Sequence, residues 1–267
     1  MGKRYPKQTI NLTFISFKKG KLYQQKNILN SPSKGKLMKI FVLFITLNFS
    51  LFSFSQFHEL GGFFGGSNYI GDIGSTNYIS PNNYALGLIY KWNMTTRYSF
   101  RASAIMANIQ KSDYTSKNIN RFLRSYKFDN NIQEFSGGVE INFEDFNLHN
   151  PETKFTPFIF LGINYFGYDL FYHDPTYQNI VNYGKDESIS IPIIFGVKTN
   201  PSPLFVIGFE IGARYALTDN IDGSKPVDPF SNNDNLIFGN INNNDWYVFS
   251  GITISFTFGD LPCYCKE

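Results

Sequence analysis

The two cysteines of this chain, Cys263 and Cys265, fall within the last five of its 267 residues. At positions i and i+2, an extended backbone would point both thiols to the same side, and a bridge between them would close a very small, strained ring. In an oxidising compartment, an exposed thiol here is a candidate for a disulfide with another protein. The residues leave an intermolecular bond, a strained internal pair and two free thiols open, while Cys-Tyr-Cys alone has too few ligands for a metal.

The three histidines, His58, His149 and His173, fall in separate parts of the sequence, and we expect a strand start, a short turn and a long loop for them. Only His173-Asp174 suggests acid–base chemistry, and a solvated turn is the competing interpretation. The chain contains no phosphate-binding loop, dinucleotide fingerprint, zinc-protease motif or serine elbow. We therefore expect no catalytic residue, no metal and no cofactor, and a protein that is not an enzyme.

A secretory signal peptide is predicted over residues 38–55. Lys39 precedes an apolar run of about fifteen residues, which is too short for a comfortable membrane span, and small residues stand at Ser53 and Ser55. We expect cleavage after Ser55, which leaves Gln56 as the mature N-terminus. No cysteine lies near that site, so lipoprotein processing is not expected.

Residues 1–37 carry nine Lys or Arg and no acidic residue. Either translation starts at Met38 or this segment is a long basic extension of the signal, and in both cases we expect it to be absent from the mature protein. Without it and Lys39, 14 Lys and Arg face 21 Asp and Glu, a formal charge of −7. This balance argues against nucleic acid as a partner.

The mature chain repeats a pattern of alternating apolar and polar residues, which is typical of strands whose two faces meet different surroundings. The connections alternate between long and short, as in outer-membrane barrels with long external loops and short periplasmic turns. We predict an all-β protein, an eight-stranded antiparallel transmembrane β-barrel over residues 56–260 in the outer membrane, with both termini, including a tail at 261–267, in the periplasm. The predicted strands are His58–Ile70, Tyr84–Trp92, Arg97–Ile109, Gln133–Phe143, Phe155–Tyr168, Ser188–Lys198, Phe205–Tyr215 and Trp246–Phe258.

Charged residues recur at mid-strand on the polar faces. A secreted β-sandwich would point them to water, whereas a small barrel would enclose them, where opposite charges neutralise one another. We favour the barrel and expect a structural plug of ion pairs rather than an ion path. The predicted interior charges are Glu59, Lys91, Arg101, Glu134, Glu140, Lys198, Glu210 and Arg214.

Aromatic residues near the predicted strand ends suit the two membrane interfaces. The candidates are Tyr90, Trp92, Tyr98, Tyr165, Tyr215 and Trp246.

The opening of the mature chain, ELGGFFGGSNYIGDI with its Gly71-Asp72 turn, and the strands YALGLIYKWNMTTRYSFRASAI and TPFIFLGINYFGY carry a resemblance. Over residues 57–260 the chain resembles the PorG-like outer-membrane β-barrel family of Bacteroidota, which is associated with the type IX secretion system. The resemblance implies a barrel that contacts outer-membrane lipids and a periplasmic ring built from a lipoprotein and its partner. It also implies that Cys263 or Cys265 could form a disulfide with the ring lipoprotein.

Our leading hypothesis is a non-enzymatic barrel that anchors this secretion and gliding machinery through its periplasmic side. The alternative is a surface-facing adhesion or ligand-binding barrel that acts through its long external loops.

Overall fold

A computed structural model describes residues 15–18, 21–24, 57–148, 153–177, 179–240 and 242–259. The chain divides into two units, Met1–Phe54 and Ser55–Glu267. In the first unit, β1 (Ile15–Lys18) and β2 (Lys21–Gln24) form an antiparallel hairpin. The predicted signal peptide, its cleavage site at Ser55 and Gln56, and both cysteines lie outside the described residues.

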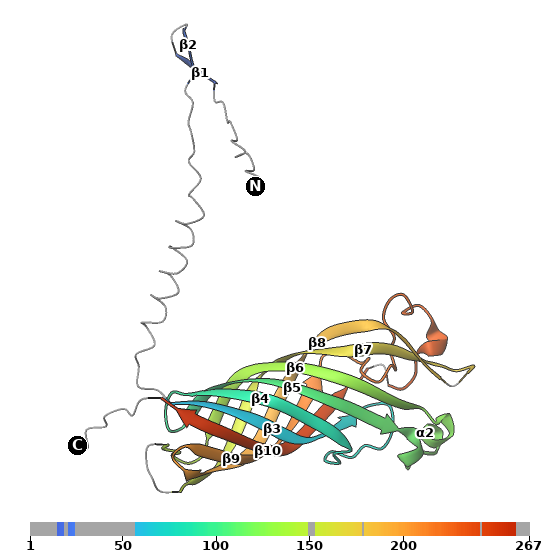
Figure 1. Cartoon of the computed structure of the whole chain (residues 1–267). Helices are drawn as coiled ribbons and strands as arrows, with labels where there is room; N and C mark the ends of the chain where they lie inside the picture. Colours follow the sequence, from blue (N-terminus) through green and yellow to red (C-terminus); the bar gives the residue numbers. More distant parts are fainter. Residues whose placement is uncertain are drawn as a thin grey trace, which may run out of the picture. The chain divides into compact units, whose positions relative to one another are not determined.

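The second unit is a closed antiparallel β-barrel of eight strands (Figure 1). Each strand pairs with the next along the chain, and β10 pairs with β3 to close the ring. All eight predicted strands are confirmed. They are β3 (Phe57–Ile70), β4 (Asn83–Asn93), β5 (Tyr98–Ser112), β6 (Lys127–Asn142), β7 (Phe155–Asp174), β8 (Asn179–Ser202), β9 (Phe205–Ala216) and β10 (Trp246–Phe258).

The connections divide the barrel into two ends. Short turns follow β4, β6 and β8 at what we name the short-turn end, where β3 also begins and β10 finishes. The other connections lie at the long-loop end, together with η2 (Asp113–Thr115), α2 (Ile119–Arg124) and η3 (Asp234–Leu236). Within the described residues, no helix is both long and apolar enough to cross a membrane.

One predicted loop is largely strand. The predicted strands Phe155–Tyr168 and Ser188–Lys198 leave a long loop between them, but β7 and β8 remain paired out to Asp174 and Asn179. A register shift between Leu170 and Phe171 separates this outer hairpin from the wall below. This outer hairpin stands above the part of the wall whose outward face contacts lipid. Apolar and polar residues therefore alternate less regularly in it, and the sequence does not indicate strands there.

The outer wall is apolar and the interior is closed to solvent. On β7, the outward Leu161 and Ile163 are 45% and 65% exposed, whereas the inward Phe158 and Phe160 are buried. A closed ring with exposed aliphatic and aromatic side chains on its outer surface fits lipid contact and rules out the sandwich. The predicted girdle residues separate by end: Tyr90, Trp92 and Tyr98 lie toward the short turns, and Tyr165, Tyr215 and Trp246 toward the long loops.

Glycines at the seam between β3 and β10 allow close packing inside the wall. Gly65 and Gly251 face each other across the strand pair. A Cβ on either would lie 2.8–2.9 Å from the Phe63 ring and nearer still to backbone oxygens. The missing side chains therefore leave the space that the Phe63 ring occupies.

The lipid-facing belt yields the first prediction. Leu161→Arg places a charge near the middle of the outward row of β7, where it should lower the free energy of unfolding by about 2–4 kcal/mol. Urea unfolding in lipid vesicles, followed by tryptophan fluorescence, measures the change. The matched control is Gln133→Arg, an outward polar position above the belt on the neighbouring β6, and an equal loss in both variants would contradict a lipid-facing belt.

Candidate functional site: charged lumen and long-loop cap

All eight charged residues predicted to face the interior are buried inside the barrel. They come from six strands, and each lies on the inward face of its strand because alternation places it opposite an outward apolar neighbour. The structure joins seven of them in two ion-paired groups.

Glu140 on β6 is the centre of the larger group. Its Oε1 accepts from Lys91 Nζ at 2.8 Å and from Lys198 Nζ at 2.6 Å. Its Oε2 lies 3.4 Å from Arg101 Nη1. One carboxylate therefore holds three cations, from β4, β5 and β8, in a space without solvent.

Glu210 supplies the second carboxylate of this group. Its two oxygens accept from Arg101 Nη1 and Nη2, both at 2.8 Å, in a bidentate pair. Because β5 and β9 are opposite each other in the ring, this contact crosses the full width of the lumen. Such planar, charge-assisted pairs are strong and directional.

Aromatic rings line the same layer. Lys91 lies 5.2 Å above the Phe158 ring and Arg101 5.2 Å above the Phe160 ring. Lys198 lies 4.8 Å from the ring of Phe146, which follows β6 in the turn to β7. These cation–π contacts give the cations a second favourable surface besides the carboxylates.

Glu134 and Arg214 form the smaller group. Arg214 Nε lies 3.2 Å from Glu134 Oε2, and its guanidinium lies 4.2 Å above the Phe249 ring. Tyr247 on the opposite strand β10 donates to Glu134 Oε2 at 2.8 Å. Ser190 hydrogen-bonds the same tyrosine hydroxyl at 2.9 Å.

Glu59 lies apart from both groups. Asn93 donates to its Oε1 at 2.9 Å, while Oε2 has no hydrogen-bond partner among the described residues. Lys91, its cross-strand neighbour, donates to Glu140 instead. Among the described ion pairs, Glu59 is therefore the one predicted interior charge that takes part in none.

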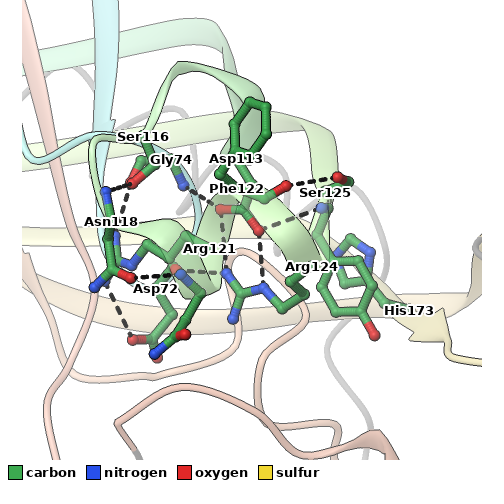
Figure 2. A network of polar contacts seen from close by, with 12 residues as sticks. Asp72, Gly74, Asp113, Ser116, Asn118, Arg121, Phe122, Arg124, Ser125 and His173 are labelled. Atoms are coloured by element: carbon green, nitrogen blue, oxygen red, sulfur yellow. Dashed lines mark hydrogen bonds and ion pairs between the residues drawn. The ribbon is translucent and has the colours of Figure 1, made fainter.

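The long-loop end is tied together by a second polar network, shown in Figure 2. Asp113 accepts from the Gly74 backbone N–H at 2.8 Å and from Arg124 Nε at 2.8 Å. Arg124 Nη2 also donates to the backbone oxygen of Asp72 at 2.8 Å. The loop after β3 is thereby fastened to the α2 segment.

The loop between β9 and β10, residues 217–245, folds into the mouth of the barrel. Ile221 is fully buried in the interior apolar cluster with Phe128 and Phe171. Its backbone N–H donates to Asp245 Oδ2 at 2.9 Å, and its carbonyl accepts from Asn130 Nδ2 at 2.8 Å. The lumen is thus filled by side chains along its length and covered at this mouth.

Three carboxyl groups of this loop, Asp219, Asp222 and Asp245, gather with Asp72 of the loop after β3, and we name these four groups the mouth cluster. Burial, repulsion from Asp72 and repulsion from Asp222 raise the pKa of Asp219 to about 7. Burial raises the pKa of Asp72, Asp222 and Asp245 as well, and repulsion from Asp222 adds to the effect at Asp72 and Asp245.

The two described histidines, His58 and His173, lie at opposite ends of the barrel. His58 stacks on Tyr90 and Phe258 at the short-turn end, and His149 lies outside the described residues. His173, expected in a solvated turn, is instead buried at 4% exposure on β7 and stacks on Tyr126 at 4.4 Å. The outer β7–β8 hairpin carries it inward, where Nε2 reaches the backbone oxygen of Asp222 at 3.1 Å. Among the described residues, no group of three or more His, Cys, Asp or Glu could hold a metal ion.

Two features of this interior were not predicted from the sequence. Phe158, Phe160 and Phe249 are apolar but point inward, and their ring faces contact the buried cations. The mouth cluster depends on an irregular loop and has no periodic signal. Only the repeated Asp in Asp219-Asn220-Ile221-Asp222 marked the segment.

The Glu140 hub yields the second prediction. Glu140→Gln removes the ion-pair partner of Lys91 and Lys198, while Arg101 keeps Glu210, and should lower the free energy of unfolding by about 3–5 kcal/mol. Adding Lys198→Met should restore part of that loss because it removes one unpaired cation. Urea unfolding in vesicles measures both.

The matched control is Asp145→Asn, which breaks the exposed Arg97–Asp145 pair and should change stability little because water screens it. Equal losses in Glu140→Gln and Asp145→Asn would show that the interior pairs do not support the barrel.

Several solved structures align with this chain at low sequence identity. Ail of Yersinia pestis, solved with the heparin analogue sucrose octasulfate, aligns at 10% identity and a TM-score of 0.42 over 77% of this chain and 100% of its own. The N-terminal barrel of Pseudomonas aeruginosa OprF aligns at 10% identity and 0.39 over 76% and 98%, and Neisserial surface protein A at 9% and 0.40 over 77% and 98%. No curated protein sequence matches the chain.

One protein family matches the chain by sequence. The profile described as "Domain of unknown function (DUF6089)" aligns with residues 37–267, which include every strand of the barrel. The protein is therefore a member of the DUF6089 family.

Proposed function

We propose that this protein is a non-enzymatic outer-membrane barrel that anchors a periplasmic assembly through its short-turn end. The filled, ion-paired lumen is the observation that carries the proposal. Eight strands enclose a space that side chains can fill completely, and here buried cations and carboxylates occupy it. A barrel without a passage acts through its ends and its wall.

The short-turn end is the end from which the cysteine tail departs. β10 finishes there at Phe258, and Cys263 and Cys265 follow within seven residues. At no more than about 3.6 Å per residue, covalent geometry keeps both thiols within roughly 25 Å of this end. In the outer-membrane orientation with short turns in the periplasm, both cysteines would face an oxidising compartment.

The resemblance to the PorG-like barrels suggests which partner this end binds. A ring lipoprotein of the type IX secretion and gliding machinery would form a disulfide with Cys263 or Cys265 in the oxidising compartment. Membrane anchoring of such a ring requires a rigid, lipid-embedded body more than a channel, and the closed barrel supports that role.

A non-reducing gel of native membranes tests the anchor. We expect a band heavier than the monomer that disappears on reduction and in a Cys263→Ser/Cys265→Ser variant, with the single variants identifying the bonding residue. Migration as the monomer alone, unchanged in the double variant, would eliminate the covalent anchor.

Pockets at the long-loop end favour a second candidate, a surface-facing barrel for adhesion or ligand binding. A pocket of about 530 Å³ lies between the β7–β8 hairpin and the β9–β10 loop, lined by Tyr172, Asp174 and Phe230 among others. Tyr172 and Phe230 pack with ring centroids 4.8 Å apart at its wall. Half-buried aromatic rings beside polar groups in a concave pocket are typical of binding sites.

On this second candidate, Phe230→Ala should reduce the number of cells that adhere to a coated surface, because it removes one wall of the pocket. The control is Tyr78→Ala, an exposed aromatic residue on the loop after β3 that does not line the pocket. Adhesion that is equal in both variants, together with an intact disulfide band, would favour the anchor.

A further inference from the structure

The mouth cluster holds more negative charge than its surroundings balance. Arg124, which is half-buried, is engaged by Asp113 through Nε at 2.8 Å and Nη2 at 3.2 Å. Arg121 reaches Asp72 only at 3.9 Å. Lys225 of the same loop is exposed to solvent, where water screens its charge.

The cluster also contains unsatisfied oxygens. Asp222 is fully buried, and its Oδ2 has no hydrogen-bond partner among the described residues, nor does Asp219 Oδ2. A buried carboxylate oxygen without a donor is costly to keep ionised. A proton on that oxygen would remove the charge that burial makes costly, so the geometry favours the protonated form.

Hydrogen bonds of this cluster hold the β9–β10 loop in the mouth of the barrel. Tyr69 donates to Asp245, and the other oxygen of Asp245 accepts from the Ile221 backbone N–H. Asp72 accepts from the Asn240 backbone N–H. Two of the four carboxyl groups therefore hold the loop down, while the charge of all four pushes it out.

The other titratable and charged groups around the cluster come from each element packed against it. They are Tyr69 of β3, Lys111 of β5, Asp113, Arg121 and Arg124 of the loop after β5, Tyr168 and His173 of β7, and Lys225 of the loop itself.

We propose that the β9–β10 loop is a proton-controlled lid, held in the barrel mouth while the mouth cluster retains protons and loosened as the cluster becomes fully ionised. The proton is the ligand, and the four carboxyl groups are its site. The lid lies at the long-loop end, so the test of this proposal does not depend on the disulfide proposed at the short-turn end.

The direction of the pH effect follows from the shifts described above. Groups whose pKa is raised in the closed state stabilise that state below their ordinary pKa near 4, and this stabilisation is lost as the pH rises through the closed-state value. For Asp219 that value is about 7. The lid should therefore be closed most firmly in acid and should loosen between about pH 5 and pH 7.

Hydrogen exchange of the full chain in lipid nanodiscs tests the lid. After correction for intrinsic exchange, protection of the amides from 219 to 224 should fall about tenfold per pH unit over this range if opening releases one proton. Amides of the ion-paired strands β5 and β6 should show no such slope.

Asn substitutions separate protonation from structure, because Asn has the shape of a protonated Asp. Asp219→Asn/Asp222→Asn should be as protected at pH 7.5 as the unmodified chain is at pH 5. Asp234→Asn, an exposed acid of the same loop, should keep the original slope. Protection that does not depend on pH in the unmodified chain, or an unchanged slope in the double variant, would overturn the lid.

The last arm repeats the exchange at pH 7.5 with added calcium and with a chelator. Equal protection in both supports the proton as the ligand. Protection that calcium restores and the chelator removes would overturn it in favour of a divalent cation.

Discussion

Charge balance inside a closed ring is the constraint on which this structure depends. Once eight strands exclude water from the lumen, an ionised side chain is tolerated only beside an opposite charge or a good donor. Glu140 meets that condition by holding Lys91, Arg101 and Lys198 at once. Arg101 also forms an ion pair with Glu210 on the opposite side of the ring. The pairs join β4, β5, β6, β8 and β9, so they fix the distances between strands that share no backbone hydrogen bonds.

The barrel could be predicted from the sequence because apolar and polar residues alternate along its strands with a period of two residues. Outward residues such as Leu161 and Ile163 contact lipid, whereas inward residues such as Glu140 contact one another. Because the two faces of each strand have different surroundings, apolar and polar residues alternate along it. The interior charges could be identified by parity alone. Their partners could not, since Arg101–Glu210 depends on which strands are opposite in the ring, and that follows only from closure.

The long-loop end was less predictable for a physical reason. Its strands rise above the lipid belt, where neither face must be apolar, and the hairpin around His173 therefore lost its alternation. Two apolar side chains of the β9–β10 loop take part in its inward fold: Ile221 packs among Phe128 and Phe171, and Phe238 packs against the same cluster. Scattered apolar residues in an Asn-rich loop give no indication of such a role.

The lumen and its mouth solve the same problem in different ways. In the lumen, fixed cations neutralise fixed carboxylates, and the result is rigid. At the mouth, the cations are fewer and neutrality must come from solution. Movement of the lid would not open a channel, because Tyr247 belongs to the apolar cluster beneath Ile221 and also donates to Glu134 of the ion-paired layer below. The loop can therefore respond to its surroundings while the wall and its ion pairs stay in place, which lets one end of the barrel change without disturbing the other.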